Sequence, residues 1–142
     1  MFDFFKKKKP SNKESKVVSL RSDDAFVAAY KKKAQSELQY LIDFMNENER
    51  DEDLFRYAIK ACFFEGDDVE HMWVQVDEFR NGYFFGRLAN EPGTVTTLKY
   101  GDDVKVTRGD VEDWILEDFL TNTSVGNFAS IYIKGDANKL EN

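Results

Sequence analysis

Apolar residues recur at three- and four-residue steps in the first third of the chain. The stripe consists of Phe26, Tyr30, Ala34, Leu38, Leu41, Ile42 and Met45. This is the spacing of one face of an α-helix. Ser22 is a good N-cap, and Asp23 and Asp24 place negative charge on the first turn. The pattern predicts one long helix of about six or seven turns, which ends within the polar run 46–53 and packs on a sheet.

Beyond the helix the periodicity changes to two, as in half-buried strands. Residues 54–64, 69–79 and 83–89 alternate in this way. Asn81-Gly82 between the last two is the pair that a type I′ hairpin turn favours. The sequence therefore predicts two consecutive β-hairpins.

The two turns set the pairing of these strands. The expected pairs are Phe64 with Val69, Ala61 with Met72 and Ile59 with Val74 in the first hairpin, and Arg80 with Tyr83, Phe79 with Phe84, Val76 with Arg87 and Val74 with Ala89 in the second. Both hairpins then predict the same core face, made of Tyr57, Ile59, Ala61, Met72, Val74, Val76, Phe85 and Ala89. A slip of one residue would exchange the faces. The opposite face is half polar and consists of Lys60, Cys62, His71, Trp73, Gln75, Phe79, Phe84, Gly86 and Leu88. Either the helix covers part of this face, or the face is a binding surface.

The C-terminal half contains short segments between tight turns. Residues 94–98 are expected to be extended, 104–107 and 111–117 to be strands, and 128–133 a strand or a short helix. The predicted fold class is α+β, with one long N-terminal helix packed on a strongly bent antiparallel β-sheet of 5–6 strands, SH3-like or small-barrel-like. The expected domain organisation is a basic and aromatic disordered tail at 1–21, a single domain at 22–134 and a frayed end at 135–142.

Composition narrows the function classes. The formal net charge is −7 and the pI about 4.8, which argues against a nucleic-acid binder. Cys62 is the single cysteine, which excludes an internal disulfide and a zinc site made of several cysteines. No apolar run reaches the roughly 20 residues of a membrane span, and the N-terminus lacks the pattern of a signal peptide, so a cytoplasmic protein is expected. Residues 1–9 combine phenylalanines with lysines, which leaves peripheral membrane contact as an alternative to a solvated tail.

Four sequence blocks carry a family resemblance: HMWV at 71–74, GRLANEP at 86–92, YGDDVKV at 100–106 and DVEDW at 110–114. In their order and spacing the chain resembles the YegJ-like family of uncharacterised bacterial domains. This family has no known catalytic residues that the resemblance could assign to positions of this chain. It implies only loosely that the protein is of the immunity type, because some related domains look like proteins that neutralise a toxin.

Little catalytic chemistry is evident. Cys62 and His71 are expected to be cross-strand neighbours, so a nucleophilic pair can be imagined. No third, orienting residue is apparent, and one His with one Cys does not suggest a metal site. We therefore expect a non-enzymatic protein without cofactor or metal.

Two binding hypotheses remain. The preferred one is a protein-binding module, for example an immunity-type protein, that docks a basic partner such as a toxin through an acidic surface containing Asp102, Asp110, Glu112 and Asp113, next to Trp114. The alternative is a small-ligand or peptide-binding domain that uses the face around Trp73, with Lys60, His71, Gln75 and Asn90. Lys60 is expected opposite Trp73, within reach of a cation–π contact.

Overall fold

The computed structural model describes residues 25–48 and 51–131. Its elements in chain order are α1 (Ala25–Ser36), α2 (Leu38–Glu47), β1 (Phe55–Glu65), β2 (Asp68–Arg80), β3 (Tyr83–Leu88), β4 (Asp103–Thr107), the short 3₁₀ turn η2 (Arg108–Asp110), β5 (Asp113–Asp118), β6 (Thr123–Gly126) and α3 (Phe128–Ile131). The predicted tail at 1–21, the predicted frayed end at 135–142 and the predicted cap Ser22 lie outside these residues.

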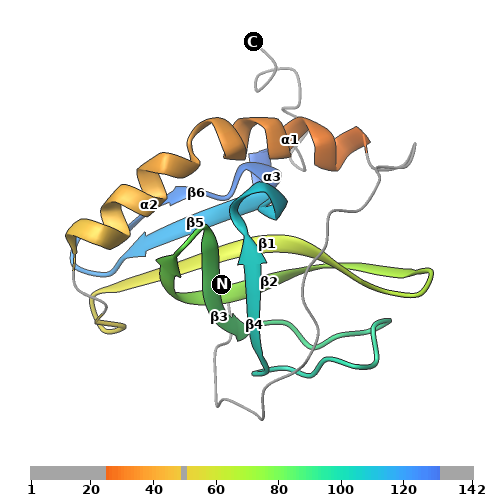
Figure 1. Ribbon diagram of the computed structural model, residues 1–142. Helices are drawn as coiled ribbons and strands as arrows, with labels where there is room; N and C mark the ends of the chain where they lie inside the picture. Colours follow the sequence, from red (N-terminus) through yellow and green to blue (C-terminus); the bar gives the residue numbers. More distant parts are fainter. Residues whose placement is uncertain (1–24, 49–50, 132–142) are drawn as a thin grey trace.

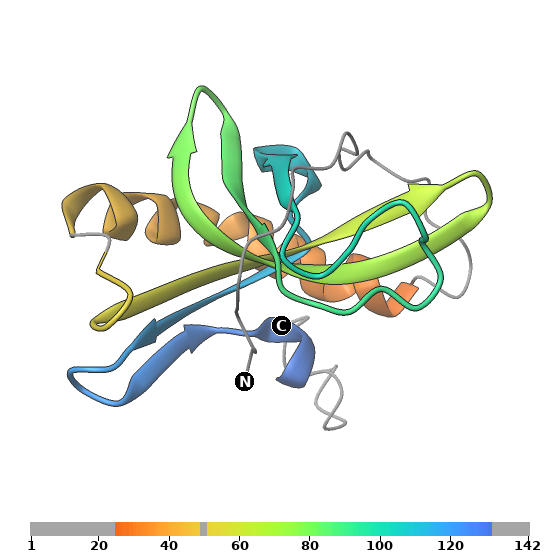
Figure 2. The ribbon, with the colours of Figure 1, turned by 90° about the horizontal axis from the view of Figure 1, so that it is seen from below.

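The strands form one antiparallel sheet, with α1 and α2 lying along one side of it (Figure 1). The strand order is β4-β3-β2-β1-β5-β6. The prediction of an α+β fold with five or six antiparallel strands is confirmed. The sheet has β4 at one end of this order and β6 at the other, so it is an open sheet and not a closed barrel. Seen from below, β2, β3 and the loop that follows β3 lie on the side away from the helices (Figure 2).

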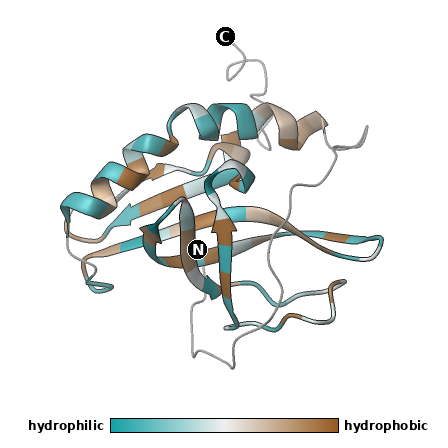
Figure 3. Ribbon diagram, in the orientation of Figure 1, coloured by the Kyte–Doolittle hydropathy of each residue, from teal (hydrophilic) through white to brown (hydrophobic). Residues whose placement is uncertain are grey.

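The prediction of one long helix is wrong, because the helical stretch is divided at Glu37. The Ser36 hydroxyl donates a hydrogen bond to the Lys33 carbonyl at 2.7 Å, and the Glu37 N–H donates to the Ala34 carbonyl at 3.2 Å. Such local bonds compete with the regular α-helical ladder. The apolar stripe itself is buried from Tyr30 to Met45, and Val27 rather than Phe26 continues it toward the N-terminus. Brown and teal residues accordingly alternate along α2 in Figure 3.

The register of the first hairpin is as predicted. Phe64 lies opposite Val69, Ala61 opposite Met72 and Ile59 opposite Val74. Ile59, Val74, Ala61 and Met72 belong to the main hydrophobic core. The alternation of β1 and the turn at Gly66 therefore contained enough information to place these two strands.

The second hairpin departs from the prediction at Asp77. Phe79 pairs with Phe84 as expected, but a bulge between Val76 and Glu78 shifts the pairs beyond it, so that Val76 faces Gly86 and Val74 faces Leu88. A bulge inserts one residue and so changes which side chains face the core. Phe84 and Leu88 are consequently in the core and Phe79 packs against it. Phe85, predicted for the core, lies on the opposite side under Arg80, whose guanidinium carbon is 4.4 Å from the ring centroid.

The loop between β3 and β4 replaces the extended segment expected at 94–98. Two carboxylates from the tip of the β1–β2 hairpin hold it. Glu70 accepts backbone hydrogen bonds from Gly93, Thr94 and Val95 at 2.7–3.0 Å, and Glu65 accepts from Thr96. Val95 and Leu98 thereby enter the core.

The end of the domain is helical. Residues 128–131 form α3, so the helical alternative holds for that stretch, and residues 132–133 are outside the described part. Strand β6 was not predicted. None of the described helices has the length and apolarity that spanning a membrane requires.

Candidate functional site

A polar cluster surrounds Lys60 on the central strands β1 and β2. As predicted, Lys60 lies opposite Trp73, and its ammonium is 5.9 Å from the Trp73 ring centroid. The ammonium also donates a hydrogen bond of 3.0 Å to the Tyr30 hydroxyl of α1. Burial lowers the pKa of Lys60, while the charges of Asp113 and Glu112 act in the opposite direction. This cluster links the helical layer to the sheet.

A third polar residue, Glu112, lies beside the predicted pair of Cys62 and His71. Cys62 and His71 are opposite one another, as expected. The Nδ1 atom of His71 lies 2.8 Å from Oε1 of Glu112. One potential ligand atom from each of Cys62, His71 and Glu112 lies within 4.8 Å of the other two. Glu112 reaches this place because its backbone N–H donates to the Lys60 carbonyl at 2.7 Å.

The acidic surface proposed from the sequence is not formed by the residues chosen for it. Asp102, Asp110, Glu112 and Asp113 are all buried, each with an exposed fraction of 5% or less. Charged side chains are seldom so buried unless they have partners inside the protein. These carboxylates therefore cannot present a solvated docking face.

Asp113 shows what such a buried carboxylate does. It accepts hydrogen bonds from the backbone N–H groups of Phe128 and Ala129 at 2.9 Å and from that of Trp114 at 2.8 Å. Burial raises the pKa of Asp113, whereas these three bonds and Lys60 lower it. The side chain fixes the start of α3 against β5.

Three other predicted site residues also support the fold. Asn90 accepts a hydrogen bond from the Trp73 backbone at 2.6 Å, and Asp102 accepts one from the Lys99 backbone at 2.9 Å. Trp114 is fully buried, donates its indole N–H to the Ala34 carbonyl at 3.0 Å and packs on Phe128. Trp114 is a core residue and not part of an exposed binding surface.

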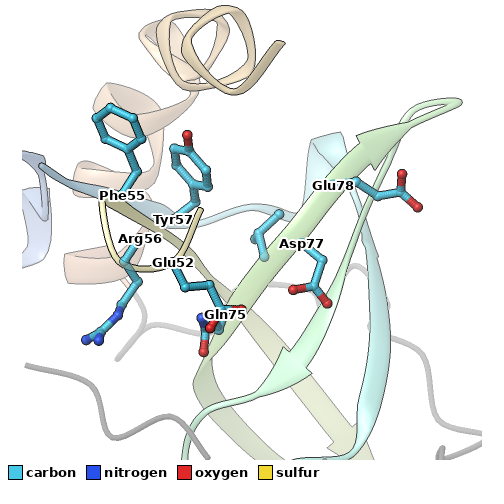
Figure 4. Close-up of a pocket in the computed structure, with 8 residues that line it drawn as sticks. Glu52, Phe55, Arg56, Tyr57, Gln75, Asp77 and Glu78 are labelled. Carbon is cyan, nitrogen blue, oxygen red and sulfur yellow. The ribbon is translucent and has the colours of Figure 1, made fainter. Parts of the chain in front are cut away.

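A cleft of about 370 Å³ lies beside this face, between the beginning of β1 and the end of β2. The two strands pair only as far as Ala58 and Gln75. Beyond that point β1 continues next to β5, and β2 turns with β3 through the bulge at Asp77. The separation of the two strands opens the cleft, which Figure 4 shows with its lining side chains.

One of the residues that line the cleft has a buried polar group with no hydrogen-bond partner among the described residues. This group is the Tyr57 hydroxyl, and burial raises the pKa of Tyr57. Gln75 lines the cleft as well and is only 4% exposed. Buried polar groups in proteins are almost always paired with protein, water or a ligand. The cleft therefore offers a hydroxyl and an amide to a bound molecule.

The mouth of the cleft is acidic. Glu52, Asp77 and Glu78 lie there, and Arg56 is the one basic residue that lines it. Arg87 lies beside the mouth and binds Glu52 at 3.2 Å and Asp77 at 3.0 Å. Phe55, Tyr57 and Val76 supply the apolar part of the wall.

Arg56 and Tyr30 were not among the site residues predicted from the sequence. Tyr57 was predicted for the core, but its hydroxyl was not recognised as a polar group of a site. Tyr57 was correctly assigned to the inward face and belongs to the hydrophobic core, and the end of the β1–β2 pairing next to it was not predicted. One signal for the divergence is present in the chain. Asp77 and Glu78 together interrupt the alternation between Val76 and Phe79, which is the pattern that a bulge leaves in a strand.

Comparison with known proteins places the chain in a family. Residues 23–138 match the family described as "Uncharacterized protein conserved in bacteria (DUF2314)". The chain belongs to this family. The resemblance to YegJ-like domains is thus confirmed, and the family description assigns no activity.

Two curated relatives are similar over part of their length. The uncharacterised protein YegJ of Escherichia coli K12 is 33% identical over 84 residues, which are 59% of this chain and 52% of YegJ. A putative ankyrin repeat protein of Neisseria meningitidis serogroup B is 38% identical over 61 residues, which are 40% of this chain and 24% of that protein. The matched region thus spans about half of the first relative and a quarter of the second. No solved structure matches the chain.

Proposed function

We propose that this domain binds a small amine-bearing molecule in the cleft between β1 and β2. The observation that carries the proposal is the buried hydroxyl of Tyr57, a residue that lines the cleft, which has no hydrogen-bond partner among the described residues. A polar group buried without hydrogen bonds costs about 1–3 kcal/mol. A bound molecule that reaches the Tyr57 hydroxyl would recover that free energy.

The size and wall of the cleft suit a small ligand. Small-molecule sites usually have volumes of about 300–1,000 Å³, apolar walls and a few polar groups that fix orientation. The cleft has a volume of about 370 Å³, with Phe55 and Val76 in its wall and the Tyr57 hydroxyl and the Gln75 amide as polar groups. A short chain with a polar end therefore fits better than a folded partner.

The charge at the mouth favours a cation. Glu52, Asp77 and Glu78 line it together with Arg56. Arg87 and Arg80 form ion pairs with these carboxylates and offset part of their charge, but the net charge of the whole chain is −7. A positively charged group is attracted to such a rim, and the ring of Tyr57 adds a face for a cation–π contact. We therefore favour an amine over a carboxylate or phosphate ligand.

The sequence suggested a small-ligand site on the face around Trp73, and the proposed site is instead the cleft between β1 and β2. Gln75 belongs to both the predicted face and the cleft, whereas His71 and Trp73 lie farther along β2. The immunity-type, toxin-binding function stays a prediction, and other carboxylates than the four buried ones would have to form its surface.

The test is an NMR titration of the purified chain with three four-carbon probes of equal length: putrescine with amine ends, butanediol with hydroxyl ends and succinate with carboxylate ends. We expect putrescine alone to shift the backbone amide signals of residues 55–57 and 75–78. The shifts should persist at about 0.15 M salt, where unspecific attraction to an acidic surface is screened beyond roughly 8 Å.

Two variants and a control locate the site. Gln75→Leu and Tyr57→Phe should each weaken putrescine binding about tenfold, since each removes a hydrogen bond worth roughly 1–1.5 kcal/mol. Asp43→Asn, an exposed position on α2, should leave it unchanged. Equal binding of the three probes, or equal putrescine binding by Gln75→Leu and the wild type, would show that the proposal is wrong.

A further inference from the structure

The geometry points to a transition-metal site, of the kind that Zn²⁺ occupies, made by Cys62, His71 and Glu112. A thiolate, an imidazole and a carboxylate are the three side-chain ligands that Zn²⁺ uses in proteins. The described part of the chain brings one of each together from β1, β2 and the segment before β5. Mg²⁺ and Ca²⁺ are disfavoured, since both prefer oxygen ligands only.

The spacing of the donor atoms fits such an ion. Bond lengths of about 2.0–2.3 Å in a tetrahedral arrangement put ligand atoms about 3.3–3.6 Å apart. The three donor atoms lie within 4.8 Å of one another, and His71 Nδ1 and Glu112 Oε1 are 2.8 Å apart. If these two atoms bind the metal, they must separate by about half an ångström and the proton of their hydrogen bond must be released.

Two of the ligands are held by regular backbone pairing. Cys62 and His71 are opposite each other in the β1–β2 ladder. Glu112 is held by the 2.7 Å hydrogen bond from its backbone to the Lys60 carbonyl. Ligands that the fold holds in this way lose little conformational freedom when a metal binds.

Burial also favours a cation at this place. Cys62 and Glu112 are almost fully buried, and a buried thiolate or carboxylate is stable only next to positive charge. Lys60 supplies part of that charge to Glu112. A bound Zn²⁺ would compensate both anionic ligands directly.

One coordination position would remain open. Structural zinc sites have four protein ligands, whereas sites with three protein ligands hold a water or ligand atom in the fourth position. The His71 side chain is 25% exposed, so the site opens toward solvent on that side. The metal site lies about 13 Å along β2 from Gln75 and can be tested independently of the cleft.

The experiment begins with chain freed of metal by chelation and titrated with Co²⁺, a coloured substitute for Zn²⁺. We expect one equivalent of Co²⁺ to produce a thiolate-to-cobalt absorption band in the near ultraviolet, and one equivalent of Zn²⁺ to remove it. Because Cys62 is the single cysteine of the chain, the band identifies the site even without a variant. Absence of the band at saturating Co²⁺ would overturn the proposal.

Variants measure the contribution of each ligand. Zn²⁺ affinity is obtained by competition with a chromophoric chelator for Cys62→Ser, His71→Gln and Glu112→Gln. Each should lose at least the 10–100-fold that is typical when residues supporting a metal site are changed. Glu91→Gln, an exposed glutamate outside the cluster, should bind as the wild type does. Wild-type Zn²⁺ affinity in Cys62→Ser and His71→Gln would contradict the proposal.

Discussion

Gly86 of β3 lies directly against the backbone of Gln75 in β2. A Cβ atom at position 86 would overlap with the Gln75 carbonyl group and come within 2.9 Å of the Val74 side chain. The close approach of these two strands keeps the second hairpin in its bulged register and brings Gln75 to the edge of the cleft.

Gly86→Ala should therefore destabilise the domain by about 3 kcal/mol or more, because backbone atoms cannot give way as a flexible side chain can. Urea unfolding at neutral pH measures the change in the free energy of unfolding. Gly109→Ala is the matched control, since a Cβ atom there meets nothing within 4 Å. A loss below 1 kcal/mol in Gly86→Ala would show that the strands are farther apart.

Asp113→Ala should cost about 3 kcal/mol. The substitution leaves the N–H groups of Phe128 and Ala129 without their acceptor and removes the charge that faces Lys60. Asp43→Ala, which removes an exposed partner of Gln39 on α2, should cost no more than about 0.5 kcal/mol. Equal unfolding free energies for the two variants would argue against the role of Asp113 at α3.

Tyr57→Phe should stabilise the protein in the absence of ligand by about 1 kcal/mol, because it removes a buried hydroxyl that has no partner among the described residues. Thermal unfolding without and with putrescine gives both effects: a higher Tm for the variant alone and a smaller ligand-induced rise. Tyr40→Phe, at an exposed position, should change neither. A Tm of Tyr57→Phe below that of the wild type would mean that the hydroxyl is already satisfied.

The buried carboxyl group of Glu117 should make the free energy of unfolding of the domain depend on pH. Burial raises the pKa of Glu117 above its ordinary 4.5, although Arg56 opposes the shift. A raised pKa means that the folded state favours the protonated form, so this contribution to stability is present below pH 4.5 and is lost as the pH rises through the folded-state pKa. Glu117→Gln should thus be more stable than the wild type at pH 7, with a gain that diminishes below pH 4.5.

Urea unfolding at pH 7 and pH 4 tests this expectation. Glu47→Gln on the exposed side of α2 serves as the control for a general change of net charge. If Glu117→Gln is less stable than the wild type at pH 7, the contact with Arg56 at 3.7 Å outweighs the cost of burial.

Local patterns predicted the first hairpin because each of its determinants is local. Alternation set the faces of β1, and Gly66 with its neighbours set the turn, so the pairs from Ile59 with Val74 to Phe64 with Val69 are correct. The pairing of Lys60 with Trp73 and of Cys62 with His71 followed from the same register.

The second hairpin required information that alternation does not contain. Val76 and Phe79 both belong inside, and a regular strand with Val76 inside would place Glu78 inside in place of Phe79. The bulge resolves this conflict and is stabilised by the contact of Asp77 with Arg87. The polar pair 77–78 was visible in the sequence, but its effect depends on the neighbouring strand.

The partners of the acidic residues were the least predictable feature. Glu112 meets His71 and Asp113 meets α3 only because β5 pairs with β1, a contact between residues 53 to 63 positions apart in the chain. Charge patterning alone suggested a solvated surface. The pairing of β5 with β1 instead turns these carboxylates into buried, hydrogen-bonded groups.

The central claim is that the cleft between β1 and β2 holds an amine-bearing ligand. A crystal structure of the chain soaked with putrescine tests it most directly. The account predicts density for the probe in the cleft, with a hydrogen bond to the Gln75 side chain and an amine near the carboxylates of Glu52, Asp77 and Glu78. Density for water alone on Tyr57 and Gln75, with putrescine absent or bound only at exposed carboxylates elsewhere, would contradict it.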